Sequence, residues 1–347
     1  MTSFANSKIL IACAITLLPA SAFASDACST RMISTTADVV TSYGATYQTR
    51  STYRATNAAV IEIIRDAASA TAVEGPYAWT KNREGEKLSS ATMKSFALGH
   101  QFHAFLLYFN DIARNIHPFT GVDFQGRTLD GITGDFPYGG KALLFGKSSQ
   151  PTGLRFEFPD TPPIDISFLD WRKQAGATLP HHIHINDGAS EFDYRYSKID
   201  ITERSPLWFF DAIPAPAIDE VQIYRLHRKL LAAHCLGDAD LMAKLTAPQI
   251  VIASRGDLFQ SSDEETRTRF TSVFKSVDYT GYYDLAEPII EVAESGDLGW
   301  AGVNVRAVGA DKANGEAFDD QWAWVMLARK IDGVWRNAGN ASNLKQK

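Results

Sequence analysis

The chain has 347 residues, 45% of them hydrophobic and 21% charged, and its formal net charge at pH 7 is −6. This length exceeds what one hydrophobic core usually serves, so we expect two domains. An acidic chain without a basic stripe does not fit proteins that bind nucleic acid or adhere to anionic lipid through charge, and after residue 24 no apolar run is long enough to cross a bilayer.

Residues 1–24 have the three regions of a cleaved signal peptide. Lys8 is their only charge, an apolar run over 9–18 follows it, and Ala22-Phe23-Ala24 has the small-x-small pattern of a cleavage site. The alternative, a buried N-terminal helix, does not explain why the three regions come in this order. We therefore expect cleavage after Ala24 and a mature chain that is periplasmic or secreted.

Two cysteines remain after this cleavage, Cys28 and Cys235. In an oxidising compartment they can form a disulfide that joins the two halves of the chain. Two separate thiols are an equal alternative, because the sequence gives no distance between them.

A β-rich first domain is expected over 25–212. Apolar and polar residues alternate, as in half-buried strands, at 154–158, 164–168, 183–185 and 192–196. The turn Asn186-Asp187-Gly188 joins the last two as a hairpin. Successive antiparallel strands with one apolar face form a curved sheet, and that face needs a cover.

The expected cover is a helix over 96–113. One helical stripe carries five apolar residues: Leu98, Phe102, Phe105, Phe109 and Ile112. The other side carries further apolar residues and the histidines His100 and His103, so we expect the helix to be buried on both sides. Between this helix and the sheet we expect a site for an acyl chain or another small apolar ligand, lined by Phe102, Phe105 and Phe109.

Pro214 and Pro216 break regular structure, and we place the domain boundary at 213–217. The second domain, 217–347, is expected to open with a helix over 221–235 that ends at Gly237, and a short helix at 238–245 that Asp238 caps. Long strands are expected at 288–294, 298–308, 319–330 and 334–342, the last two joined by an Asp332-Gly333 turn.

Three segments of the second half resemble the SnoaL-like and ketosteroid-isomerase-like members of the nuclear-transport-factor-two-like superfamily. They are the helix 224–238, the stretch Ser295–Trp300, and the closing Trp322-Ala323-Trp324 with the motif over 330–336. The resemblance implies an α+β cone of the cystatin-like type, in which a curved sheet wraps around helices and a pocket, and often a dimer.

The first half is similar, over about 155–210, to the lipoprotein-carrier (LolA-like) group of periplasmic half-barrels. Asp170-Trp171-Arg172, the stretch 176–180 and the strand Phe192–Tyr196 carry this similarity. It implies a half-barrel that holds acyl chains and is closed by helices. The expected fold class is therefore α+β: a curved antiparallel half-barrel with a covering helix, then an α+β cone.

The acid and base that ketosteroid isomerases use do not carry over to this sequence. Leu230 stands where the tyrosine acid is expected, and Ala253-Ser254 stands where the carboxylate base is expected. The candidate that remains is Asp320, which shares one side of its strand with Trp322 and Trp324.

On the neighbouring predicted strand, one side carries Trp300, Gly302, Asn304 and Arg306. If both sides face the cone, Asp320 is a candidate general acid or base, and Trp300 and Trp322 contact the ligand. The alternative is a tryptophan-rich core in which Asp320 pairs with Arg306.

Histidine pairs raise the question of a metal. His182 and His184 share a strand face, and His100 and His103 lie one helical turn apart, so either pair can contribute to a zinc site. No acidic or cysteine ligand nearby completes either pattern, so we expect no metal and no cofactor.

These observations favour an exported two-domain protein that binds an acyl chain or other small apolar ligand. The alternative is an isomerase, dehydratase or cyclase that acts on a small apolar substrate in the cone. A third possibility is a structural role, with the second domain forming a homodimer.

Overall fold

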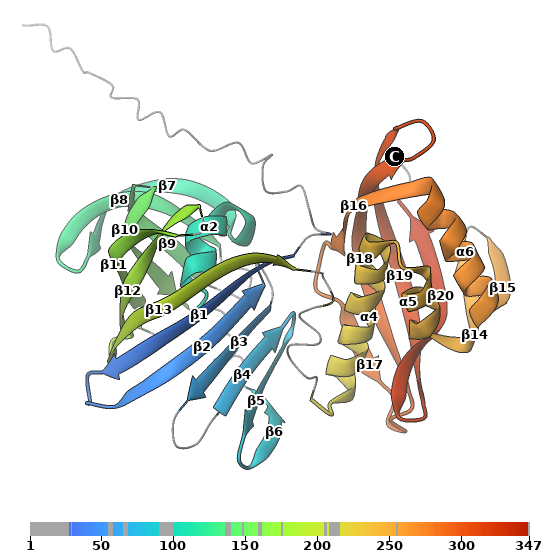
Figure 1. Ribbon diagram of the computed structural model, residues 1–347, viewed down its shortest axis with the longest axis horizontal. Coiled ribbons are helices and arrows are strands. Elements are labelled where there is room, and N and C mark those ends of the chain that lie inside the picture. Colours follow the sequence, from blue (N-terminus) through green and yellow to red (C-terminus); the bar gives the residue numbers. More distant parts are fainter. Residues whose placement is uncertain are drawn as a thin grey trace, which may run out of the picture.

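The computed structural model describes residues 28, 30–54, 58–64, 69–89, 100–135, 140–147, 149–158, 162–174, 176–204, 207, 216–254 and 256–345. The expected signal peptide and most of the expected 213–217 boundary lie outside these residues. The described part is mostly strand, with four helices, and forms two separate sheets (Figure 1). The α+β class is therefore confirmed. None of the described helices combines the length and apolarity that a bilayer span needs.

The first sheet has thirteen antiparallel strands in the order β6-β5-β4-β3-β2-β1-β13-β12-β11-β10-β9-β8-β7. Two meanders, β1 to β6 and β7 to β13, therefore meet where β1 pairs with β13. The bounds are β1 Thr30–Thr41, β2 Thr46–Arg54, β3 Ala58–Ile64, β4 Ser69–Glu74, β5 Tyr77–Asn82, β6 Gly85–Leu88, β7 Arg114–Phe124, β8 Arg127–Asp135, β9 Lys141–Lys147, β10 Gln150–Glu157, β11 Ile164–Gln174, β12 Ala177–Asn186 and β13 Glu191–Arg204.

Helix α2 (Phe102–Ile112) packs on the apolar face of this sheet, as expected of the cover. Alternate residues of the strands beneath it are buried, such as Ile33 in β1 and Ile183 in β12. The helix has no side-chain N-cap, no acidic residue in its first turn and no basic residue in its last. Packing therefore stabilises it more than its own ends do.

The second sheet has seven strands in the order β15-β14-β20-β19-β18-β16, with β17 also paired to β18. Helices α4 and α5 lie against one side of it (Figure 1). The bounds are α4 Asp219–Leu236, α5 Ala239–Leu245, β14 Thr246–Ser254, β15 Asp257–Ser262, α6 Asp263–Ser276, β16 Val277–Asp284, β17 Ile289–Val292, β18 Leu298–Asp311, β19 Ala317–Ile331 and β20 Val334–Leu344.

Local signals in the sequence explain several boundaries of the second half. Gly237 adopts a left-handed conformation (φ 62°) and ends α4, and the Asp238 side chain accepts a hydrogen bond from the Leu241 amide at the start of α5. Ser262 and Glu265 form a reciprocal capping box that starts α6.

The two faces of the second sheet differ. On the inner face, buried residues of β18 pack against the apolar side of α4, as Val303 and Val305 do with Leu226 and Leu230 in one core. The outer face carries exposed apolar residues such as Leu327. The inner face, covered by helices, therefore holds the interior of the cone.

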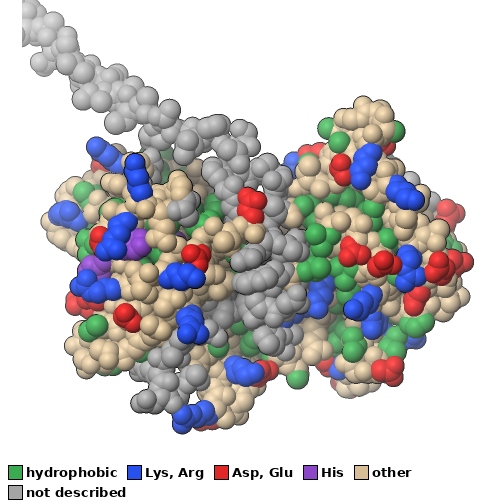
Figure 2. All heavy atoms as spheres, in the orientation of Figure 1, with side chains coloured by type: hydrophobic (Ala, Val, Ile, Leu, Met, Phe, Trp, Pro, Cys, Tyr) green, Lys and Arg blue, Asp and Glu red, His purple; other side chains and the backbone are tan. Residues whose placement is uncertain are grey.

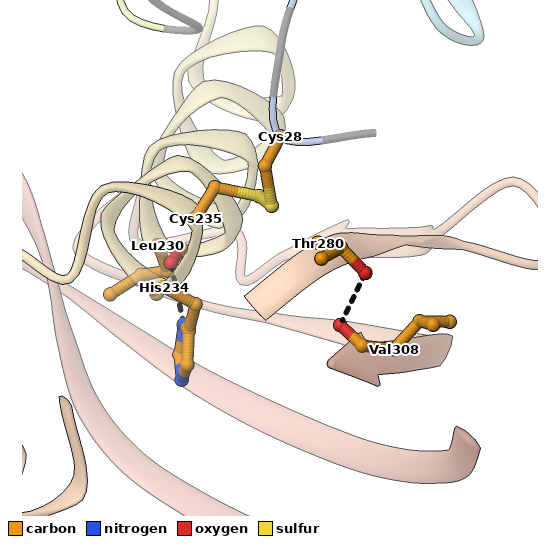
Figure 3. Close-up of a disulfide and its surroundings, with 6 residues drawn as sticks. All are labelled: Cys28, Leu230, His234, Cys235, Thr280 and Val308. Atoms are coloured by element: carbon orange, nitrogen blue, oxygen red, sulfur yellow. Dashed lines mark hydrogen bonds between the residues drawn. A yellow bond between two sulfur atoms is a disulfide. The ribbon is translucent and has the colours of Figure 1, made fainter. Parts of the chain in front are cut away.

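Contacts between the two halves gather on α4. Cys235, near the end of α4, forms a disulfide with Cys28 (Figure 3). Val221, in the first turn of α4, joins a small core with first-half residues that include Met32 and Trp79. The half of the chain before α4 is thus fixed to this helix along its length. On the face shown in Figure 2, acidic and basic side chains are interspersed over both halves.

Candidate functional site

The interior of the cone contains a buried imidazole–carboxylate pair. His227 on α4 is fully buried, and its Nε2 lies 2.7 Å from Oδ1 of Asp284, at the end of β16. The other oxygen of Asp284 accepts a hydrogen bond of 2.8 Å from Nη1 of Arg228. A carboxylate only accepts hydrogen bonds, so Nε2 carries a proton, and whenever the ring is neutral its lone pair is on Nδ1.

The Nδ1 atom of His227 is buried and has no hydrogen-bond partner among the residues that the structure describes. Buried polar atoms in folded proteins are nearly always paired, so an orphaned one needs an explanation. A carboxylate that orients one ring nitrogen and leaves the other without a hydrogen bond is an arrangement found in general bases.

Electrostatics keep Asp284 ionised in this setting. Burial raises the pKa of its carboxyl, but His227 and Arg228 together lower this pKa by more than burial raises it, so the net shift is downward. Burial likewise opposes the charge of Arg228, whereas Tyr224 and Asp284 raise its pKa. The carboxylate is thus available to stabilise a positive charge on the imidazole.

Aromatic rings surround this pair. The ring centroid of Trp324 on β19 lies 5.9 Å from that of His227 and 6.2 Å from that of Tyr282 on β16. Tyr282 stacks on His234 at 4.2 Å and contacts Tyr279 at 5.3 Å. The interior of the cone near His227 is therefore lined by aromatic rings.

Several inner-face rings keep part of their surface accessible. They are Tyr279, Phe318, Trp322 and Trp324, and Phe270 of α6, which packs against the same core, is partly exposed as well. Partly exposed rings that point to the covered face of a sheet mark the accessible side of the cone.

Asp320 lies on the inner face of β19, opposite Ala307 of β18, and is partly exposed. Burial raises the pKa of Tyr279, and the Asp320 carboxylate adds to this, which places Asp320 near Tyr279. Asp320 thus shares the cone with the His227–Asp284 pair but is not part of it.

His234, in the last turn of α4, is held as a neutral ring. Its Nδ1 donates a hydrogen bond of 2.8 Å to the carbonyl oxygen of Leu230 (Figure 3). Burial lowers its pKa to about 4. It therefore serves as an aromatic wall at neutral pH.

The expectation that Trp300 and Arg306 face the cone is wrong. Trp300 pairs with Leu327 across the strands, on the outer face, whereas Val305 pairs with Trp322 on the inner face. Arg306 binds Asp319 (2.7 Å), not Asp320. Alternation correctly grouped the residues of each strand, but only the register shows which groups share a face.

The three phenylalanines expected to line an acyl site lie in the core of the first half. Phe102 and Phe105 are 1% exposed and Phe109 is 5% exposed. The Phe105 ring packs 5.0 Å from that of Phe156. In this structure they contact other core side chains, and their role in ligand binding stays a prediction.

The two histidine pairs lie at different places in the first half and contact different partners. Nε2 of His103 bonds to the Pro180 carbonyl oxygen (3.0 Å), while His182 and His184 both face Asp193, with N–O distances of 2.6 and 3.5 Å. Within the described part of the chain, no group of three or more histidine, cysteine, aspartate or glutamate side chains could hold a metal ion.

Sequence reasoning missed both members of the central pair. His227 lies inside the helix that was expected over 221–235, on its buried side, and a histidine on an apolar helix stripe was the signal available. Asp284 lies at the end of a strand for which we had no expectation, so their meeting across 57 positions could not be foreseen.

Neither a known protein family nor a curated protein matches this sequence. Solved structures are similar over its C-terminal part. A ketosteroid isomerase-like protein from Erwinia carotovora atroseptica is 20% identical with a TM-score of 0.32, covering 37% of this chain and 98% of that one.

An NTF2-like superfamily protein from Salmonella enterica is 14% identical with a TM-score of 0.34, covering 37% of this chain and 92% of that one. A protein with a cystatin-like fold from Caulobacter vibrioides is 14% identical with a TM-score of 0.30, covering 36% of this chain and 88% of that one. The likeness concerns the fold alone. The resemblance of the first half to lipoprotein carriers stays a prediction.

Proposed function

We propose that the cone of the second half binds a small apolar ligand and moves a proton on it, with His227 as the group that carries the proton. The observation behind this is the buried pair of His227 and Asp284, in which Nδ1 has no hydrogen-bond partner among the described residues and the imidazole contacts the Trp324 ring. The reaction class is an isomerisation or dehydration of a small apolar carbonyl or hydroxyl compound.

In this mechanism Nδ1 of His227 accepts a proton from a carbon next to the ligand's carbonyl group. The electron pair of the broken C–H bond moves into the carbonyl, and the ring becomes an imidazolium. Asp284 stabilises that charge through Nε2, and Arg228 holds the carboxylate in place. In a ligand with a neighbouring carbon–carbon double bond, the electron pair returns through that bond and the γ carbon takes the proton, which completes an isomerisation. In a ligand with a β-hydroxyl group, the electron pair returns to form a carbon–carbon double bond, the carbon–oxygen bond breaks, and the proton leaves with the hydroxyl as water, which completes a dehydration.

Binding is tested with 2-naphthol, a flat apolar probe whose hydroxyl can donate to Nδ1 and whose fluorescence reports its environment. We expect saturable binding, weakened about tenfold in His227→Asn, since a buried hydrogen bond contributes about 1–2 kcal/mol. The matched control is His117→Asn, at an exposed histidine of β7. Equal affinity in wild type and His227→Asn would contradict the proposal.

We also propose that the mature chain is exported to the periplasm or secreted. The disulfide between Cys28 and Cys235 supports it, because such bonds persist in oxidising compartments. Mass spectrometry of the protein purified from its host should give a chain that begins at Ser25. A chain that retains residues 1–24 would refute cleavage.

A second candidate function is the binding of an acyl chain under α2. The observation that favours it is that α2 lacks capping and charge support at its ends, so this cover is held mainly by its contacts with the sheet, which include the hydrogen bond between His103 and Pro180. Native mass spectrometry of the mature protein, followed by solvent extraction, should find a lipid that is absent from folded Phe105→Asp. The same lipid content in both proteins would dismiss this candidate.

We further propose that the protein forms a homodimer through its second half. The outer face of its sheet exposes neighbouring apolar side chains of β17, β18 and β19, namely Ile289, Leu298, Val325 and Leu327. A second copy that packs on this face covers them. Sedimentation should show a dimer for the mature chain and a monomer for Leu327→Lys, and a monomeric wild type would exclude it.

A further inference from the structure

A buried ion pair connects the first half of the protein to α4. Glu74, at the end of β4, is completely buried, and its Oε2 accepts a hydrogen bond of 2.7 Å from Nε of Arg225, whose side chain is 6% exposed. The guanidinium of Arg225 lies 5.4 Å from the ring centroid of Trp79. Removing one partner of such a pair leaves an uncompensated buried charge.

This ion pair continues towards the His227–Asp284 pair. Arg225 and Arg228 are three residues apart on α4, so their side chains are neighbours on the helix surface. The Glu74 carboxylate is among the charges that act on Arg228. Arg228 in turn donates to Asp284. A continuous row of charges therefore runs from the first half into the cone.

The charges in this row balance. Two carboxylates, Glu74 and Asp284, face two guanidinium groups, Arg225 and Arg228, so the cluster is neutral while His227 is neutral. Among the described residues, Tyr224 and His234 on α4 and Tyr282 on β16 also lie near this cluster, and burial lowers the pKa of His234 and raises that of Tyr282. Of the two guanidinium charges beside the pair, Glu74 offsets one.

A close fit fixes the position of Glu74. The next residue, Gly75, has a φ of +53°, and a Cβ there would lie 2.1 Å from the Tyr224 hydroxyl oxygen. Only glycine therefore allows β4 to approach α4 this closely. At the other end of α4, the Cys28–Cys235 disulfide ties the same two halves together.

We propose that Glu74 is a positioning residue of the cone, supplied by the first half, which sets the charge around His227 and Asp284. The first half is then part of the site and not a separate module. This inference rests on the role proposed for His227, but it concerns charge coupling that exists whether or not a ligand reacts.

The test follows the imidazole nitrogens of His227 by NMR in the full mature chain, across pH. Removing a nearby unit charge from a protein interior moves such a titration by about one pH unit. In Glu74→Gln, which leaves excess positive charge, His227 should take up its second proton at lower pH than in wild type. In Arg225→Gln it should do so at higher pH, and Glu74→Gln/Arg225→Gln should return close to wild type.

Glu86→Gln is the matched control, because Glu86 lies on the same sheet but pairs with Lys81 near the surface, and it should leave the titration unchanged. Shifts in opposite directions support the proposal, since general disturbance of the fold does not predict opposite signs. Shifts in one direction for both single variants, or no shift in either, would overturn it. If the titrations shift as expected in a protein that does not bind 2-naphthol, the charge coupling stands and the proposed function fails.

Discussion

Burial of His103 should make the fold sensitive to acid. His103 on α2 is completely buried, its ring edge packs on Tyr196 at 4.7 Å, and its Nε2 donates to the Pro180 carbonyl. Burial lowers its pKa to about 4, from an ordinary value of 6.5. Between these two pH values the unfolded chain binds a proton that the native chain does not, so the free energy of unfolding falls as the pH falls.

The size of this effect follows from the two pKa values. A complete shift corresponds to about 3 kcal/mol, of which about 2 kcal/mol is lost between pH 7 and pH 5. In His103→Phe the titrating group is absent, at the cost of about 1 kcal/mol for the lost hydrogen bond. Wild type should therefore be the more stable protein at pH 7 and the less stable one at pH 5.

Urea unfolding at pH 7, 6 and 5 measures this directly. His234 has a similarly lowered pKa but is present in both proteins, so its contribution cancels in the comparison. His117→Asn, at an exposed histidine, should follow wild type at every pH. If His103→Phe loses as much stability between pH 7 and pH 5 as wild type does, His103 is not the cause of the acid sensitivity.

Three further predictions concern stability, each measured by urea unfolding. Replacing Cys28 and Cys235 by serine should cost about 2–5 kcal/mol, because the bond closes a loop with a sequence separation of 207; an unchanged midpoint would mean that the thiols are not joined. Phe105→Ala should cost about 3–5 kcal/mol, whereas a cost below 1 kcal/mol would place its ring outside the core. Gly75→Ala should destabilise more than Gly44→Ala, since both have positive φ but only the first meets a phenol ring, and equal costs would exclude that contact.

The sequence predicted those parts of the fold that local patterns determine. The expected strands at 298–308, 319–330 and 334–342 correspond to β18, β19 and β20, and the Asp332-Gly333 turn joins the last two. Gly237 and Asp238 act at the helix ends as expected. Each of these strands, turns and helix ends depends on residues a few positions apart, so the sequence alone is enough to predict it.

The site depends on contacts that no local pattern encodes. His227 meets Asp284 across 57 positions, and Arg225 meets Glu74 across 151. The Cys28–Cys235 pairing stayed open for the same reason, because the sequence gives no distance between residues far apart in the chain. Trp300 was placed on the wrong face, because strand register decides which faces meet. By contrast, the Ser262–Glu265 capping box of α6 was present in the sequence and could have been read.

If His227 moves protons on apolar ligands, the protein should exchange the protons beside the carbonyl group of an apolar ketone. The mature protein is incubated with 2-tetralone in deuterated buffer, and mass spectrometry follows deuterium uptake at the carbons beside the carbonyl. We expect uptake faster than in buffer alone, slowed at least about 100-fold towards that background in His227→Asn and unchanged in His117→Asn. Uptake at the buffer rate in wild type, or equal rates in wild type and His227→Asn, would contradict it.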